Sequence, residues 1–214
     1  LAVASELLRT GVPVDQAGPG GVTPLIRAAS QGSDEFVRAL LNAGADPDIR
    51  DDKGRTPALA AAQSGQTRLI ALLAAAGADL NLGDRENETP LIAAARRGDG
   101  SLWPETERPR AKLLKLGATV DARSRDGNTA LITAATAGHS DILGQLITAG
   151  ANTNLRNKVG NTALMVAAVQ GRGEAVQLLL VAGADADLVN VDHRTARDLA
   201  VLANETGIVT LLPR

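Results

Sequence analysis

The stretch "TPLIRAASQGSDEFVRALLNAGADPDIR", residues 23–50, contains the signals of two short helices and their caps. Thr23 is a favourable N-cap residue, and Pro24 suits the first helical position because its missing N–H would have no partner there. Gly32 is expected to end this first helix. The second helix is indicated by apolar residues at helical spacing, namely Phe36, Val37, Leu40 and Leu41. Gly44 supplies a left-handed C-terminal cap, so the stretch predicts a helix pair followed by a turn-rich link.

The same pattern recurs along the whole chain of 214 residues. The threonines that open the copies are Thr23, Thr56, Thr89, Thr129, Thr162 and Thr195, separated by 33, 33, 40, 33 and 33 residues. The glycines that end the first helices are Gly32, Gly65, Gly98, Gly138 and Gly171. Both series place a seven-residue excess in the third copy, after Gly98. Because a helix pair this short cannot bury its own apolar face, the copies are expected to stack into a solenoid.

This pattern, D-x-x-G-x-T-P-L-x-x-A-A-x-x-G, then a helix, then L-L-x-x-G-A-D-x-N, resembles the ankyrin repeat. Residues 51–81, "DDKGRTPALAAAQSGQTRLIALLAAAGADLN", match it closely, and so do residues 124–154, "SRDGNTALITAATAGHSDILGQLITAGANTN". The resemblance covers nearly the whole chain. It implies an all-α ankyrin-repeat solenoid of stacked helix-turn-helix units with β-hairpin-like connecting loops.

The register of the copies predicts a division of the chain. We expect a partial N-terminal repeat, limited to its second helix, at 1–17, five ankyrin repeats at 18–50, 51–83, 84–123, 124–156 and 157–189, and a C-terminal capping repeat at 190–214. The repeat at 84–123 carries the seven-residue insertion after Gly98.

Some positions depart from the family pattern. The turn glycine is replaced by Asn87 and His193, two residue types that tolerate left-handed backbone. The family's usual histidine after T-P-L is also replaced, by Ile26, Leu59, Ile92, Ile132, Met165 and Asp198. The apolar replacements are expected to pack inward.

Composition and motifs argue against several functional classes. The net charge of −2 disfavours general nucleic-acid binding, the chain has no cysteine, and no apolar run is long enough to span a bilayer. The two histidines, His139 and His193, fall at predicted turns in different repeats, and "GPGG" at 18–21 lacks the context of a phosphate loop. The carboxylates Asp46, Asp79, Asp121 and Asp185 are assigned to turn hydrogen bonding because they recur with the repeat. We therefore expect no enzyme, no cofactor and no metal.

A protein partner is the expected ligand. The resemblance implies that hairpin tips and the exposed side of the first helices form a concave binding surface. The cations at such positions are Arg50, Lys53, Arg55, Arg85, Arg96, Arg97, Arg123, Arg125, Arg156, Lys158 and Arg194. The anions are Asp52, Glu86, Glu88, Asp126 and Asp192. This excess of cations, centred on the third repeat, predicts an acidic partner surface; the alternative is that variable surface positions simply carry soluble side chains.

The insertion contains Trp103, the only tryptophan of the chain. Trp103 precedes Pro104, so an extended backbone is expected there. Two interpretations stay open. Leu102 and Trp103 fold back over apolar helix surface, or Trp103 anchors the partner beside Arg96 and Arg97, since Trp and Arg are typical of binding hot spots. The predicted partner-binding set is Arg55, Arg85, Arg96, Arg97, Trp103, Arg123, Arg125, Arg156 and Lys158.

Two other functions are weighed against this scaffold. One is a structural role, in which an exposed repeat end at Leu1 pairs with another chain; the scaffold itself is expected to be a monomer or to self-associate weakly. The other is an enzyme or a small-molecule receptor, which no motif favours. An alanine-rich composition with more Arg than Lys favours a bacterial ankyrin protein, and the sequence leaves open whether it resides in the cytoplasm or the periplasm.

Overall fold

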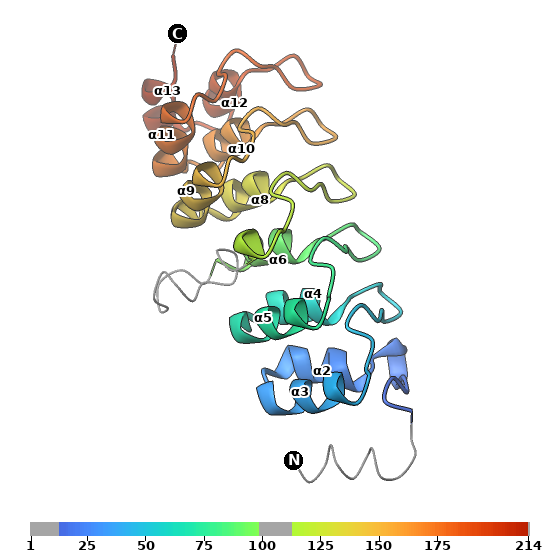
Figure 1. Cartoon of the computed structure of the whole chain (residues 1–214). Helices are drawn as coiled ribbons and strands as arrows, with labels where there is room; N and C mark the ends of the chain where they lie inside the picture. Colours follow the sequence, from blue (N-terminus) through green and yellow to red (C-terminus); the bar gives the residue numbers. More distant parts are fainter. Residues whose placement is uncertain (1–12, 99–112, 214) are drawn as a thin grey trace. The chain divides into compact units, whose positions relative to one another are not determined.

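The chain folds into helices joined by hairpin-like loops. The computed structural model describes residues 13–98 and 113–213. The chain divides into two compact units between Thr119 and Val120, and each is described by itself. Within the described ranges the regular structure is helical, with no strand, as the sequence predicted. Figure 1 shows helix pairs in layers within each unit, with a loop protruding between successive pairs.

Among its described residues the first unit contains a short 3-10 helix, η1 (Pro19–Gly21), and two complete helix pairs. These pairs are α2 (Pro24–Gln31) with α3 (Asp34–Asn42), and α4 (Pro57–Ser64) with α5 (Thr67–Ala75). Next follows α6 (Pro90–Arg97), and residues 113–115 are helical again. Helix α2 packs against α4 and α4 against α6, while α3 packs against α5.

The second unit contains three helix pairs. They are α8 (Ala130–Ala137) with α9 (Ser140–Thr148), α10 (Ala163–Val169) with α11 (Gly173–Val181), and α12 (Ala196–Leu202) with α13 (Thr206–Leu211). Helix α10 lies between α8 and α12, and α11 lies between α9 and α13. Each unit therefore buries apolar surface between successive copies of one motif, which a single short pair could not do.

The first helix of every copy begins at the predicted threonine. Each threonine hydroxyl accepts a hydrogen bond from the backbone N–H three residues later, at 3.2 to 3.4 Å. In the last copy Asp198 returns the bond to the backbone N–H of Thr195 at 2.9 Å, which completes a capping box. Helices α2, α4, α6 and α8 end at the predicted glycines in left-handed conformation, with Gly65 at φ +75°.

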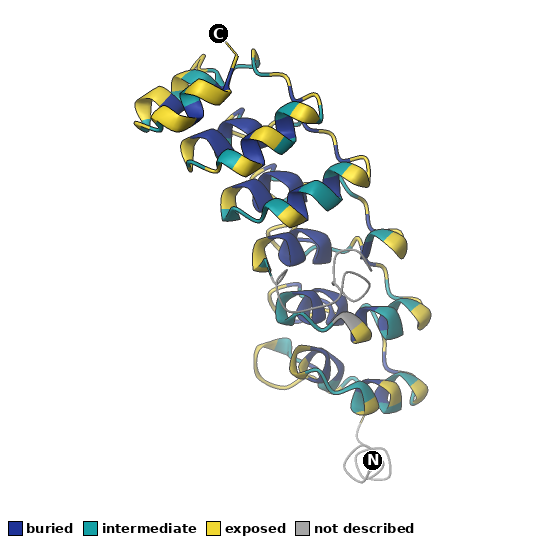
Figure 2. Cartoon of the chain, turned by 90° about the vertical axis from the view of Figure 1, so that its left-hand side faces the viewer, coloured by how far each residue is buried: buried dark blue, intermediate teal, exposed yellow. Residues whose placement is uncertain are grey.

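Buried residues, dark blue in Figure 2, lie on the helices of each unit, and most of them are aliphatic or alanine. The residues that replace the usual histidine, Ile26, Leu59, Ile92, Ile132 and Met165, are all buried, as predicted. Alanines such as Ala61 and Ala134 are fully buried on the first helices. Their small size lets neighbouring helices approach closely, so the fold needs few aromatic side chains.

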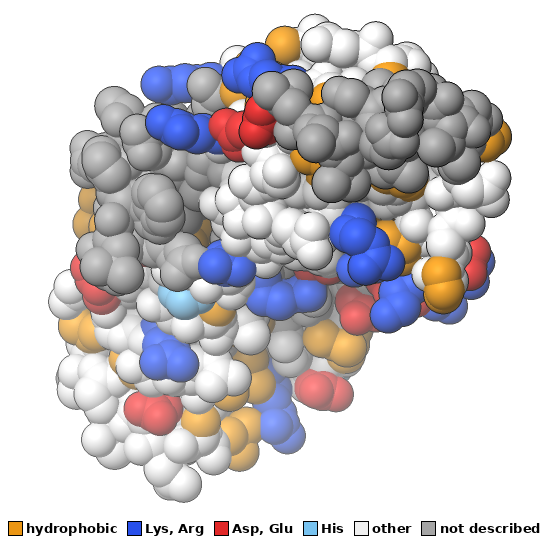
Figure 3. Space-filling view, turned by 90° about the horizontal axis from the view of Figure 1, so that it is seen from below, with side chains coloured by type: hydrophobic (Ala, Val, Ile, Leu, Met, Phe, Trp, Pro, Cys, Tyr) orange, Lys and Arg blue, Asp and Glu red, His pale blue; other side chains and the backbone are white. Residues whose placement is uncertain are grey.

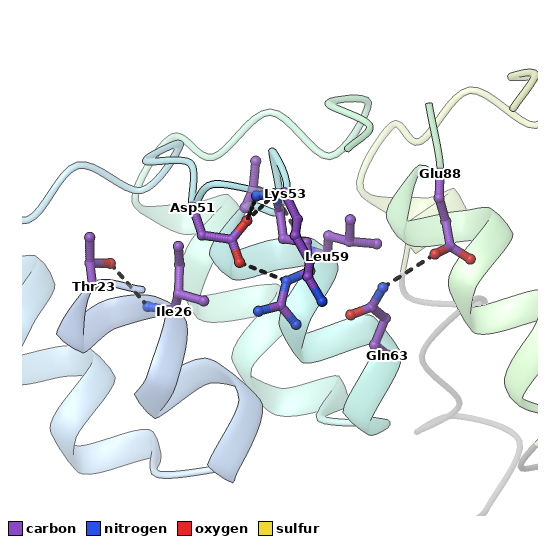
Figure 4. A network of polar contacts seen from close by, with 9 residues as sticks. Thr23, Ile26, Asp51, Lys53, Leu59, Gln63 and Glu88 are labelled. Atoms are coloured by element: carbon purple, nitrogen blue, oxygen red, sulfur yellow. Dashed lines mark hydrogen bonds and ion pairs between the residues drawn. The ribbon is translucent and has the colours of Figure 1, made fainter. Parts of the chain in front are cut away.

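The loops between pairs are turns fixed by their own side chains. In the loop before α4, one oxygen of Asp51 accepts hydrogen bonds from the backbone N–H groups of Lys53 and Arg55, at 2.9 and 2.8 Å (Figure 4). Asp84, Asn157 and Asn190 form the same pair of bonds in later loops. Positive φ at the turn position is taken by Asn87, at +54°, and by His193, at +58°, as the sequence predicted.

Successive loops are also joined through their backbones. The N–H of Arg85 donates to the carbonyl of Lys53 at 3.0 Å, and the N–H of Asp52 donates to the carbonyl of Gly20 at 3.0 Å. The "GPGG" stretch is thus the loop of the first copy. A side chain at Gly21 would place a Cβ 2.7 Å from the backbone nitrogen of Asp52, so close approach of two loops accounts for the glycine.

Most of the recurring aspartates have the predicted turn role. Asp46, Asp79 and Asp185 each accept a hydrogen bond from the backbone N–H two residues later, at 2.9 Å. Asp121 does not share their position, which corrects the sequence assignment. It is equivalent to Asp48 and accepts from the backbone N–H of Asn152 in the next loop at 3.1 Å. The sequence shows this shift, because Asp121 lies four residues after Gly117 just as Asp48 lies four residues after Gly44.

Candidate partner-binding site

The end of α6 holds the two arginines at the centre of the predicted site. Arg96 and Arg97 form the last turn of the helix, before the left-handed Gly98. Cations are favourable there because the backbone carbonyls at a helix C-terminus carry partial negative charge. Both side chains reach the surface, with 61% of the Arg96 side chain accessible. Their place at the end of the first helix of this repeat is the one that the sequence predicted.

Arg96 forms an ion pair with an acid from the loop before its own helix. Its Nη1 lies 2.6 Å from Oε1 of Glu88. The other carboxylate oxygen, Oε2, accepts a hydrogen bond of 3.2 Å from Nε2 of Gln63 on α4 (Figure 4). Glu88 is 8% exposed, so its charge is buried and has partners on two helices. Glu88 was predicted to be an exposed acid, and its burial shows that this prediction was wrong.

Arg97 crosses from α6 to the end of α4. Its Nη1 donates a hydrogen bond of 2.9 Å to the backbone carbonyl of Gln63. The guanidinium also lies against the left-handed Gly65, where a Cβ would be 2.9 Å from Nε of Arg97. Arg97 therefore satisfies a carbonyl at the helix end, in addition to presenting charge at the surface.

These side chains surround a surface hollow of about 200 Å³. It is lined by Gln63, Glu88, Ala93, Arg96 and Arg97. Two guanidinium groups and one buried carboxylate leave the hollow with a net positive charge. Its donors suit an incoming carboxylate, because guanidinium groups bind carboxylates with paired hydrogen bonds. Gln63 and Glu88 were missed as site residues, since their roles depend on contact between two copies.

The two other predicted arginines of the first unit lie in loops. Arg55 is held by Asp51, with its Nε 2.7 Å from Oδ2, and its side chain is 31% exposed. Burial opposes ionisation of Asp51, but hydrogen bonds from the backbone and side chain of Arg55 and from the backbone of Lys53 outweigh it and lower the pKa of this carboxyl. Arg85 is exposed at a loop tip. Arg55 thus serves the fold, whereas Arg85 faces solvent.

The remaining predicted cations belong to the second unit. Arg125, Arg156 and Lys158 are exposed in its loops. Arg123 is exposed too, and its Nη1 donates a 2.8 Å hydrogen bond to the carbonyl of Arg156. Exposed Lys and Arg side chains emerge in several separate groups, some beside Asp or Glu (Figure 3). Each unit therefore presents its own set of cations.

Trp103, the predicted anchor, lies outside the described residues, as do the insertion and the N-terminal end at Leu1. Both histidines occupy turns: His139 precedes α9, and His193 takes positive φ in a loop. Among the described residues no cluster of His, Cys, Asp or Glu is suited to hold a metal ion. In the same residues, helices stay too short or too polar to cross a membrane.

Comparison with known families agrees with the repeat pattern. A family model described as ankyrin repeats in three copies matches residues 25–103, 106–190 and 134–213, and thus most of the chain. No curated protein shows a significant match to the chain.

Proposed function

Because this chain belongs to the ankyrin-repeat family, whose repeats generally mediate interactions between proteins, we propose that it is a non-enzymatic scaffold for an acidic partner protein. The proposed contact is centred on the third repeat, in the hollow beside Arg96 and Arg97. The predicted cations of the loops extend the attraction beyond the hollow.

The observation that carries the proposal is the pair of guanidinium groups at the rim of a hollow. The Arg96 side chain is 61% exposed although it is paired with Glu88, so it is accessible to a partner. A guanidinium group presents its five N–H donors in a planar fork that matches a carboxylate. A partner carboxylate would therefore bind at Arg96 and Arg97, in competition with Glu88 for the guanidinium of Arg96.

Several features support the non-enzymatic part of the proposal. Ankyrin repeats are typically interaction modules without catalytic activity. Perturbed carboxyl groups in the described residues have structural causes: Asp51 is held by Arg55 and Lys53, and the pKa of Asp198 is lowered by hydrogen bonds from Thr195. Asp51 accepts bonds from backbone N–H groups and a guanidinium, and the Thr195 hydroxyl that Asp198 binds is the N-cap of α12, so both carboxyl groups serve the fold.

Binding of a labelled peptide of alternating Asp and Glu to the full chain tests the proposal. Its affinity is compared with that of an otherwise equal peptide of Asn and Gln. Arg96→Glu should weaken binding of the acidic peptide about tenfold or more, because it places a like charge at the hollow. Arg38→Glu is the matched control, since Arg38 is an exposed cation on the second-helix layer, in α3, and the change in net charge is identical.

Two results would contradict the proposal. Equal affinity for the acidic and the neutral peptide would contradict the proposal that the partner surface is acidic. Equal losses in the Arg96→Glu and Arg38→Glu variants would show that net charge, and not the hollow, governs binding. Circular dichroism of both variants checks that neither change disturbs the helices.

A further inference from the structure

Two exposed valines lie side by side on neighbouring loops of the second unit. Val159 is 52% exposed and Val191 is 61% exposed. The backbone N–H of Val191 donates a 3.2 Å hydrogen bond to the carbonyl of Val159, so the two residues are joined directly. The loops that carry them, before α10 and before α12, protrude beside each other in Figure 1.

The repeat pattern gives no structural reason for these valines. At the position of Val191 the two preceding loops carry Arg125 and Lys158, and at the position of Val159 the preceding loop carries Asp126. The loop with Arg125 and Asp126 forms the same connection, since the N–H of Lys158 donates to the carbonyl of Asp126 at 2.9 Å. Charged side chains therefore suffice for the turn and for its contact with the next loop.

Cations predominate around the valine pair. At the two loop tips that carry the valines, residues 156–160 and 190–194, the exposed cations are Arg156, Lys158 and Arg194, and the exposed anion is Asp192. Two adjacent exposed aliphatic side chains surrounded by charge are unlike the single apolar residues scattered over protein surfaces. Apolar contact at the centre with complementary charge around it is the usual arrangement of a protein interface.

We infer that Val159 and Val191 form a second contact point, for an acidic segment of the partner that carries a branched aliphatic side chain. The valines receive the aliphatic group, and the surrounding cations attract the carboxylates on either side of it. This inference rests on the proposed function for the acidic character of the partner. It adds an apolar requirement that the hollow beside Arg96 does not impose.

The test uses three peptide probes and the isotope-labelled full chain. The probes are Glu-Asp-Leu-Leu-Asp-Glu, its analogue with Ser in place of both Leu, and its analogue with Lys in place of all four acids. Amide shifts are followed during titration. We expect the acidic peptide with leucines to shift Lys158, Val159 and Val191, and to bind at least about fivefold more tightly than the serine analogue, because aliphatic surface is buried. The lysine analogue should bind least.

The matched variant exchanges both valines for the residues of the fourth repeat. Val159→Asp with Val191→Arg introduces the residues found at the equivalent positions, Asp126 and Arg125, and leaves the net charge unchanged. Both loops should therefore fold as the loop before α8 does. It should reduce the affinity for the leucine peptide to that for the serine analogue. Val181→Ser, at an 89% exposed valine that ends α11, is the control and should have no effect.

The outcomes separate the two proposals. If the leucine and serine peptides bind equally to the wild type, or if the double valine variant keeps the leucine preference, the valine contact is refuted while the acidic scaffold stands. If the lysine analogue binds as well as the acidic peptide, the acidic partner is refuted. Shifts confined to residues near Arg96 would likewise refute the valine contact and leave the hollow in place.

Discussion

Nη1 of Arg97 donates a 2.9 Å hydrogen bond to the backbone carbonyl of Gln63, and this bond ties the end of α6 to the end of α4. One side chain thus links two successive repeats and also contributes charge to the hollow. Binding experiments that change Arg97 alone would mix these two roles. Arg96 is the better probe of binding, because the acid with which it forms an ion pair, Glu88, lies just before its own helix.

Because Arg97 contacts Gly65, we expect substitutions at the two residues to have coupled effects on the free energy of unfolding. Gly65→Ala adds a Cβ 2.9 Å from Nε of Arg97 and should cost about 1–2 kcal/mol for the left-handed backbone, plus the displaced hydrogen bond. In an Arg97→Ala background the second part is already lost, so the cost of Gly65→Ala should fall by about 0.5–1 kcal/mol. Urea unfolding of the two single variants and the double variant measures this difference.

Gly77→Ala is the control for this cycle. Gly77 has φ +94°, and a Cβ added there would have no atom within 4 Å, so its substitution costs backbone strain alone, with or without Arg97. Additive losses for Gly65→Ala and Arg97→Ala would mean that the added methyl group does not disturb the bond from Arg97 to Gln63.

Asp51 predicts a loss of stability in acid. Its hydrogen bonds from Arg55 and Lys53 lower its pKa in the folded protein below the unfolded value of about 3.9. The folded state therefore binds this proton less readily, and the stabilisation is complete above about pH 4 and is lost as the pH falls through the folded-state pKa. Urea midpoints between about pH 6 and pH 3 should show a smaller decline in Asp51→Asn than in the wild type.

The Asn variant is suitable because the fold already uses asparagine at this position. Asn157 accepts the same two backbone hydrogen bonds in its loop, at 3.2 and 2.9 Å. Asp51→Asn should thus keep the turn and lose the charge pairing with Arg55. An unchanged pH dependence in the variant would assign the acid sensitivity to other carboxyl groups.

We expect substitutions of the loop glycines to destabilise the fold by amounts that depend on how closely the neighbouring loop approaches. A Cβ at Gly160 would lie 2.8 Å from the backbone nitrogen of Val191, and backbone cannot move aside as a side chain can. Gly160→Ala should therefore cost more than the roughly 1–2 kcal/mol of left-handed strain. Gly150→Ala, at φ +85° with no atom within 4 Å, should cost only that strain. Thermal unfolding compares the two, and equal losses would show that the loops separate without penalty.

The fold could be predicted from the sequence because its signals are local. Each threonine cap bonds a residue three positions away, and each glycine cap ends its own helix. The sequence of a single copy therefore determines where its first helix begins and ends. Repetition then predicts the stacking, since no copy can bury its apolar face alone. Asn87 and His193 could be placed for the same reason, because left-handed backbone depends on the residue itself.

The site could be predicted only in part, because its contacts join different copies. Glu88 directly precedes the N-cap Thr89, just as Arg55 directly precedes the N-cap Thr56. This position in the repeat does not indicate that Glu88 is buried. Its burial depends on Gln63 of the preceding repeat and on Arg96 at the far end of the next helix. Such pairings are fixed by packing distances and not by spacing along the chain.

Glu88 itself predicts how the hollow responds to a loss of negative charge. A carboxylate 2.6 Å from Nη1 of Arg96 competes with any partner carboxylate for the same guanidinium. Glu88→Gln keeps the size and polarity of the side chain and removes that competitor. The acidic peptide should then bind about three- to tenfold more tightly at low salt, and the gain should shrink at high salt because ions screen the charge. Calorimetric titrations at both salt concentrations measure it.

Glu86→Gln separates this local effect from net charge. Glu86 is an exposed acid in the same loop, and its substitution changes the total charge by the same amount. An equal gain in both variants would mean that Glu88 acts only through the overall field. A weaker affinity in Glu88→Gln would reverse the interpretation. Glu88 would then act as a positioning residue that holds Arg96 in its binding orientation, and a partner carboxylate would bind the pair together instead of displacing Glu88.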